Sequence, residues 1–79
     1  MTTDTSSIRQ AIADCLDDKP IFQDIDDDQD FFDIGASSLT IVNLQIQIEK
    51  SINLKVPTSE LMLNPTLNGW VKTYVNAIP

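Results

Sequence analysis

The chain has 79 residues and no histidine, and its 12 acidic and 5 basic side chains give a net charge of −7. This length supports one small domain that buries about 60% of its extended surface, so a deep catalytic cleft is not expected. The charge disfavours a nucleic-acid partner, and the lack of histidine excludes histidine-based acid–base catalysis and the common zinc sites.

Targeting signals are not evident in the sequence. The first twenty residues contain no continuous apolar run of the kind found in signal peptides, and no stretch approaches the roughly 20 apolar residues of a membrane span. The single cysteine, Cys15, excludes an internal disulfide framework. We therefore expect a cytoplasmic protein without a membrane partner.

Residues 6–17 have the period of an amphipathic helix. Its apolar side chains recur at steps of three and four, and they are Ile8, Ala11, Ile12, Cys15 and Leu16. Ser6 or Ser7 can cap the start, and the polar run before Pro20 ends the helix. The position of Cys15 on the apolar face predicts a small buried hydrophobe and not a reactive thiol.

Residues 18–36 form a long connection in which acidic residues concentrate. Eight of the twelve acids lie between positions 17 and 33, where Lys19 is the only base. Six apolar side chains interrupt them, namely Ile21, Phe22, Ile25, Phe31, Phe32 and Ile34. Loops of this length are usually packed by their own side chains or serve a function. We expect the aromatic residues to anchor the loop to the core while the aspartates face water.

The aspartates raise the alternative of a calcium site. The helix–loop–helix calcium loop requires glycine at position 6 and a bidentate acid at position 12. Counted from Asp24, these positions hold Gln29 and Gly35, and counted from Asp26 they hold an aromatic residue and a serine. Neither register fits. A solvated acidic face is the better interpretation, and a calcium-responsive helical protein is a minor alternative.

Residues 38–51 predict a second helix with two apolar stripes. The first stripe consists of Ile41, Leu44, Ile48 and Ile52. The second stripe lies on a neighbouring face and consists of Leu39, Val42 and Ile46. A surface helix in a small bundle needs about one apolar stripe. The surplus stripe therefore indicates either a mostly buried central helix or a strip that faces a partner.

The C-terminal third completes an all-α fold. An extended connector reaches Pro57, a short helix spans residues 58–63, and the last helix runs to about Asn76, with Asn64 or Thr66 as its cap and Pro65 in its first turn. One face of that helix carries Leu67, Trp70, Val71 and Tyr74, and Gly69 within it either allows close packing or is simply tolerated. The prediction is a small four-helix bundle, with three main helices, one short helix and a long first loop.

Two adjacent serines stand where the second helix begins. Gly35 permits a backbone turn that a side chain would obstruct, and Ser37 and Ser38 follow it. The N-terminus of a helix presents unpaired N–H groups and a positive dipole end, which would stabilise a phosphate ester on a serine. Taken alone, these residues favour plain capping by either serine.

The stretch "DFFDIGASSL" resembles the attachment-site signature of the acyl and peptidyl carrier proteins, Asp-x-Gly-x-x-Ser-Leu. The later stretches "EKSINLKVP" and "NPTLNGWV" are also similar to landmarks of that family, and the resemblance extends from about residue 8 to 76. It implies a carrier domain over residues 6–78 behind a flexible tail at residues 1–5. In that family the serine directly before the leucine carries 4′-phosphopantetheine, so the resemblance assigns the arm to Ser38.

The resemblance also implies a mode of action. A non-catalytic, monomeric carrier would receive its arm from a phosphopantetheinyl transferase and an acyl or aminoacyl group from a loading enzyme, and would then serve downstream synthase, transferase and tailoring domains. We expect partners to contact Leu39, Val42, Asn43 and Ile46. The alternative is a small helical interaction module that is never modified.

Two departures from the family pattern narrow the subtype. Ser37 stands where many members have aspartate or histidine, and the second helix is nearly free of acids, with Glu49 as the exception. Carriers of fatty-acid synthesis resemble one another in an acidic second helix. The run "FFDIG" is more similar to carriers of non-ribosomal peptide and polyketide assembly lines, so we expect a free-standing carrier in secondary metabolite biosynthesis.

Overall fold

The computed structural model describes residues 4–78 as a bundle of helices without a strand. Four α-helices follow in chain order, α1 (Thr5–Asp17), α2 (Ser38–Ile52), α3 (Thr58–Leu63) and α4 (Leu67–Asn76). The connection after α1 contains two short 3-10 helices, η1 (Pro20–Phe22) and η2 (Phe32–Ile34). The predicted fold class, three main helices with one short helix and a long first loop, is confirmed.

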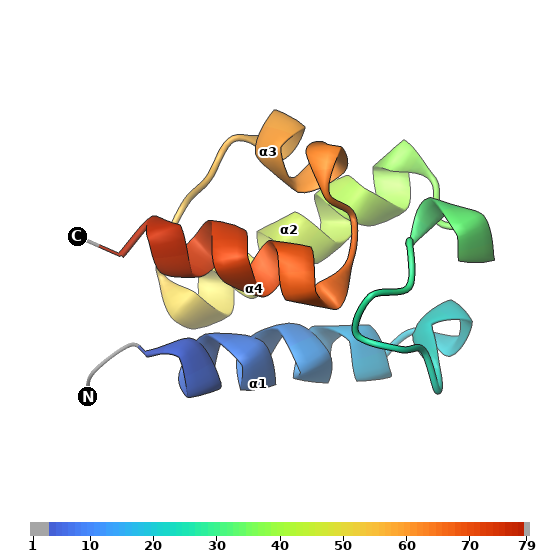
Figure 1. Cartoon of the computed structure of the whole chain (residues 1–79), viewed down its shortest axis with the longest axis horizontal. Helices are drawn as coiled ribbons and strands as arrows, with labels where there is room; N and C mark the ends of the chain where they lie inside the picture. Colours follow the sequence, from blue (N-terminus) through green and yellow to red (C-terminus); the bar gives the residue numbers. More distant parts are fainter. Residues whose placement is uncertain (1–3, 79) are drawn as a thin grey trace.

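The helices enclose a single core. In Figure 1, α1 and α4 lie side by side, α2 lies behind them, and α3 crosses at the top of the bundle. α1 contacts both α2 and α4, and α3 contacts the same two helices. The buried apolar side chains are Ile8, Ile12, Leu16, Phe22, Phe31, Ala36, Ile41, Leu44, Ile48, Leu61, Leu67, Trp70, Val71 and Tyr74. Every main helix contributes most of its predicted apolar face to this set, and Ala11, Cys15 and Ile52 are only partly buried.

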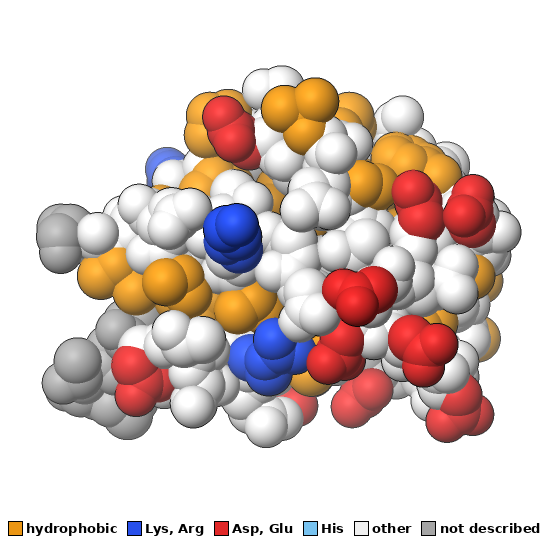
Figure 2. Space-filling model, viewed as in Figure 1, with side chains coloured by type: hydrophobic (Ala, Val, Ile, Leu, Met, Phe, Trp, Pro, Cys, Tyr) orange, Lys and Arg blue, Asp and Glu red, His pale blue; other side chains and the backbone are white. Residues whose placement is uncertain are grey.

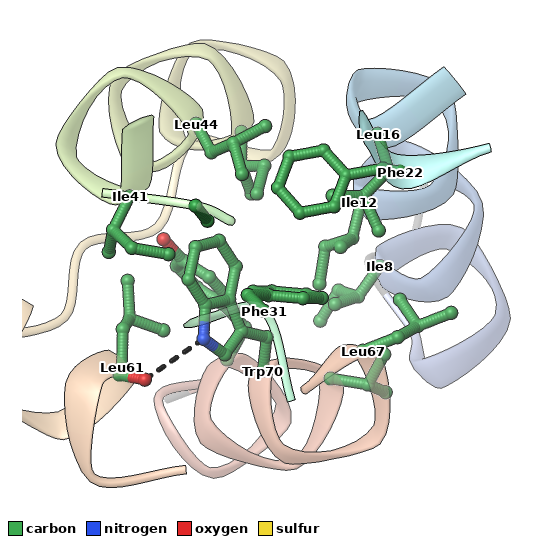
Figure 3. Packing of buried hydrophobic residues seen from close by; sticks show 14 residues of the cluster. Ile8, Ile12, Leu16, Phe22, Phe31, Ile41, Leu44, Leu61, Leu67 and Trp70 are labelled. Carbon is green, nitrogen blue, oxygen red and sulfur yellow. Dashed lines mark hydrogen bonds between the residues drawn. The ribbon is translucent and has the colours of Figure 1, made fainter. Parts of the chain in front are cut away.

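Phe31 lies at the centre of the core, although it belongs to the loop between α1 and α2 (Figure 3). Its ring makes edge-to-face contacts with Phe22 and Trp70, each at a centroid distance of 5.1 Å. Such aromatic pairs contribute about 0.5–1.5 kcal/mol each beyond their burial. The Trp70 indole N–H donates to the carbonyl oxygen of Leu61 at 3.0 Å, so the last turn of α3 is attached to the same cluster.

The long loop is anchored by fewer residues than predicted. Phe22 and Phe31 are buried, whereas Ile21 and Phe32 are about 40% exposed, at 42% and 39%. Phe31 and Phe32 are adjacent and their side chains leave the backbone in different directions; here Phe31 enters the core and Phe32 does not. The Phe31 N–H also donates to the Pro65 carbonyl at 2.8 Å, which ties the loop to the start of α4.

The N-terminal caps of α1 and α4 differ in part from the prediction. Asp4 caps α1 by accepting from the Ser7 N–H at 2.8 Å, so the predicted capping by Ser6 or Ser7 is wrong and the helix begins one residue earlier. A carboxylate is stabilised by the positive end of the helix dipole. The hydrogen bonds that Asp4 accepts from Ser7 lower the pKa of its carboxyl group. The part of the predicted tail at residues 1–3 lies outside the described residues.

Of the two caps considered for α4, Thr66 is the one observed. Its hydroxyl accepts from the Gly69 N–H at 2.9 Å, and Pro65 is buried before the helix, so its predicted place in the first turn is wrong. Gly69 is required for close packing, because a Cβ there would come within 2.5 Å of the backbone oxygen and side chain of Asn64.

Cys15 is half-buried against the core rather than fully buried, and burial raises the pKa of its thiol.

A polar network holds the connector between α2 and α3. The Glu49 carboxylate accepts from the Gln45 amide, the Val56 N–H and the Tyr74 hydroxyl, each at 3.1 Å. Gln45 is only 7% exposed, and its amide also donates to the Val56 carbonyl at 2.8 Å while its oxygen accepts from the Thr58 hydroxyl at 2.6 Å. Three segments distant in sequence are therefore joined by satisfied polar groups, which specify one position for the connector.

We expect the free energy of unfolding to fall above about pH 10 in a manner that depends on Tyr74. Burial, followed by the neighbouring Glu49 charge, raises the pKa of Tyr74 well above its usual value near 10. The unfolded chain then loses the phenol proton first, so the stabilisation is complete below pH 10 and declines as the pH rises further. Urea unfolding between pH 8 and 11 measures this. Tyr74→Phe should flatten the decline, and an equally steep decline in that variant would contradict the linkage.

Candidate functional site

The turn before α2 is built on the Phe31 anchor. After η2, Gly35 adopts a left-handed backbone with φ of 104°, where other residues are strained, and its N–H donates to the Phe32 carbonyl at 3.1 Å. Ala36 is buried and donates to the Phe31 carbonyl at 3.1 Å. The core residue Phe31 therefore fixes the direction in which the chain enters α2.

Ser37 is the N-cap of α2. Its hydroxyl accepts from the Thr40 N–H at 3.2 Å and lies 3.1 Å from the Thr40 hydroxyl, and its carbonyl accepts from the Ile41 N–H at 3.1 Å. One serine of the pair thus has the capping role that the sequence left open between the two.

Ser38 has a different environment from its neighbour. It is the first residue of α2, and its side chain is exposed and makes no hydrogen bond within the part of the chain that the structure describes. The backbone N–H groups of Ser38 and Leu39 precede the first intrahelical donor, so they are directed out of the helix end. The hydroxyl is consequently accessible to an enzyme and lies beside two N–H groups that favour an anion.

The two apolar stripes of α2 have different exposures. Ile41, Leu44 and Ile48 are fully buried, and Ile52 packs against the core at its edge. On the neighbouring face Leu39 is 69% and Ile46 is 48% exposed, Val42 is half-buried and Asn43 is exposed. We call Leu39, Val42, Asn43 and Ile46 the α2 strip. The helix is thus both a core helix and the support of an apolar surface.

Besides Ile21, two exposed apolar residues outside α2 were not among the predicted site residues. Phe32 lies at the start of η2, six residues before Ser38, and Leu63 is 82% exposed at the end of α3. No pattern in the sequence distinguished Phe32 from Phe31 as the exposed member of the pair. No pattern in the six residues of α3 indicated Leu63.

The acidic residues gather over the first loop, as the space-filling view shows beside α1 and α4 (Figure 2). The only ion pair within residues 4–78 joins Arg9 to Asp27 at 3.3 Å. Asn68 links to the loop by donating from its amide to the Asp28 carboxylate at 2.8 Å.

Within residues 4–78 no group of three or more histidine, cysteine, aspartate or glutamate side chains could hold a metal ion. Nor does any helix among them have the length and apolar character to cross a membrane.

A comparison with protein-family models decides the family. The model described as "Phosphopantetheine attachment site" matches residues 6–73, which is most of the chain. The chain belongs to this family. It is therefore a carrier protein whose cofactor is covalently attached 4′-phosphopantetheine. Searches of curated proteins and of solved structures give no match.

The residues at the start of α2 fit the phosphodiester of this carrier protein's cofactor. An attachment residue needs a hydroxyl that is exposed and not required by the fold, and Ser38 has both properties because Ser37 caps the helix. The helix end supplies N–H donors and a positive dipole for the phosphate. Ser37 fits less well, since its oxygen already accepts from Thr40 and any substituent on it would weaken the cap.

The two serines should differ in their effect on stability. We expect Ser37→Ala to lower the free energy of unfolding by about 1 kcal/mol, because the Thr40 N–H loses its acceptor. Ser38→Ala should change it by less than about 0.5 kcal/mol, as is usual for an exposed position without partners. Urea denaturation of the unmodified protein measures both. Equal effects of the two substitutions would show that the capping assignment is incorrect.

Proposed function

We propose that Ser38 is the attachment residue and that the chain carries acyl or aminoacyl intermediates. The observation that supports this most directly is the division of labour between the two serines, in which Ser37 caps α2 and Ser38 leaves its hydroxyl exposed. A phosphopantetheinyl transferase would transfer phosphopantetheine from coenzyme A to that hydroxyl: the serine oxygen forms the new phosphodiester as the diphosphate bond of coenzyme A breaks and adenosine 3′,5′-bisphosphate leaves. Within residues 4–78 no side chain hydrogen-bonds to the Ser38 hydroxyl, so the base that removes the serine proton would come from the transferase.

The chain's own part in the chemistry would be presentation and not catalysis. When bound, 4′-phosphopantetheine supplies a thiol that holds acyl or aminoacyl groups as thioesters. The helix N-terminus at Ser38 would hold the phosphate end by its N–H groups, so the rest of the arm extends from a fixed point. Tethering raises the local concentration of the bound group at a docked enzyme, so weak and transient docking is sufficient.

We further propose that the α2 strip is the surface on which partner enzymes dock. The strip begins at Leu39, next to Ser38, so an enzyme seated on it would have its active site within reach of the arm. A stripe of exposed apolar side chains on an otherwise charged small protein is typical of interaction surfaces. Phosphopantetheinyl transferase, the loading enzyme and downstream synthase, transferase and tailoring domains would use it in turn.

The chemistry of α2 favours an assembly-line carrier of non-ribosomal peptide or polyketide biosynthesis. Between Ser38 and Ser51, Glu49 is the only acid, and its carboxylate is directed into the polar network of the connector. The exposed side chains of the strip are apolar or neutral. A partner would therefore recognise it by apolar contact, unlike the acidic second helix of fatty-acid carriers.

Incubation with coenzyme A, magnesium and a broad-specificity phosphopantetheinyl transferase should add one phosphopantetheine to the protein. Intact-mass measurement follows the addition. Ser37→Ala should retain most of the modification, whereas Ser38→Ala should abolish it because the accepting hydroxyl is gone. Modification that survives in Ser38→Ala would overturn the assignment, and a wild-type protein that stays unmodified would support an unmodified interaction module instead.

Substitutions on the two faces of α2 should separate docking from folding. Val42→Asp and Ile46→Asp should leave the helical circular dichroism unchanged while lowering the rate of arm transfer or loading about tenfold or more, in line with the loss of an interface anchor. Ile48→Asp should unfold the domain, because Ile48 is fully buried and an unpaired charge there costs several kcal/mol. If all three variants behave alike, the division of the helix into two faces is wrong.

A further inference from the structure

Two lysines, Lys50 and Lys55, lie beyond the C-terminal end of the α2 strip. Ile46, at the C-terminal end of the strip, lines a surface hollow of about 360 Å³ together with Glu49, Lys50, Asn53 and Lys55. Lys50 belongs to the last turn of α2 and Lys55 to the connector that follows, and both are exposed. The two lysines therefore line the same hollow as an exposed apolar side chain of the strip.

Glu49 also lines this hollow, but it forms no ion pair with Lys50 or Lys55. Its carboxylate accepts three hydrogen bonds from Gln45, Val56 and Tyr74. Within residues 4–78 neither lysine takes part in an ion pair. These hydrogen bonds direct the Glu49 carboxylate toward the connector but leave it charged. The lining of the hollow therefore has two positive charges and one negative charge, which leaves it a cationic rim.

The rest of the charge distribution makes this rim distinctive. Residues 17–33 contain eight aspartates and one lysine, which accounts for the whole net charge of −7, and the other four acids and four bases cancel. The first loop is consequently the acidic pole of the molecule. The C-terminal end of α2 carries positive charge, about 18 Å from Ser38 along a helix that rises about 1.5 Å per residue.

We propose that the partner protein that docks on the α2 strip presents an apolar surface with carboxylates at the end remote from Ser38, which seat beside Lys50 and Lys55. This inference rests on the proposed docking role of the strip and specifies the partner's chemistry. An apolar stripe alone accepts a partner in either direction along the helix. The lysine pair removes this ambiguity, because only one direction places carboxylates on the cationic rim.

The test uses two designed helical peptides of 18 residues as probes. Both carry the same four-leucine stripe, and the last turn holds three glutamates in one peptide and three lysines in the other. Titration of the ¹⁵N-labelled protein, followed by amide shifts, should show the glutamate peptide binding about fivefold tighter, as expected for two exposed ion pairs. The shifts should include Ile46, Lys50 and Lys55, and the preference should shrink as salt is added.

Charge-reversed variants provide the control. Lys50→Glu/Lys55→Glu should invert the preference, and the milder Lys50→Gln/Lys55→Gln should bring the two affinities within about twofold. Lys19→Glu/Lys72→Glu makes the same change in net charge away from α2 and should keep the original preference.

Several results would overturn the proposal. They are equal affinities of the wild-type protein for both peptides, binding of neither peptide, and a control pair that inverts the preference as well. Arm attachment distinguishes this failure from failure of the proposed function. If the wild-type protein gains one phosphopantetheine at Ser38 but binds both peptides equally, the carrier function stands and the partner chemistry proposed here does not.

Discussion

The packing of Phe31 between Phe22 and Trp70 is the interaction on which the rest of the structure depends. The long first loop has no regular secondary structure beyond two short turns, so its path is set by side chains that reach the core. The Phe31 N–H also donates to the Pro65 carbonyl and the Phe31 carbonyl accepts from the Ala36 N–H, which joins the loop to the starts of α4 and α2. A loop residue thus aligns the helix that carries the candidate attachment site.

The second helix combines two functions that usually need separate elements. Its buried face holds the core through Ile41, Leu44 and Ile48, while its exposed strip is the surface on which we propose that partners dock. Gln45 and Glu49 occupy the boundary and bind the connector. The polar groups of Gln45 and Glu49 bond within the protein, so they add no polar contact to the exposed strip. Within residues 4–78 neither Lys50 nor Lys55 forms an ion pair. The hydrogen bonds of Gln45 and Glu49 to the connector therefore help to keep the exposed strip of α2 free of acidic groups.

Periodicity predicted most of the fold, because each main helix has one apolar face with the spacing of a helix. It could not show whether the surplus stripe of α2 was buried, since that depends on which helices cover it. Periodicity also could not predict the capping residues. Asp4 and Ser37 cap their helices, rather than the serines near them, because theirs is the extended backbone that precedes the first helical residue. The choice between Phe31 and Phe32 depended in the same way on the direction of the loop. The candidate attachment site came from a motif, and the structure adds the environment of each serine.

The capping role of Ser37 has a consequence for a protein that would pass repeatedly between unmodified, modified and loaded states. The hydrogen bonds that close the start of α2 involve Ser37 and Thr40 and do not include the Ser38 hydroxyl. A large substituent on Ser38 can therefore be added or removed without opening the helix. Attachment at Ser38 would therefore leave the fold unchanged, and partner enzymes would have to distinguish the forms by the arm and its cargo and not by a change in the bundle.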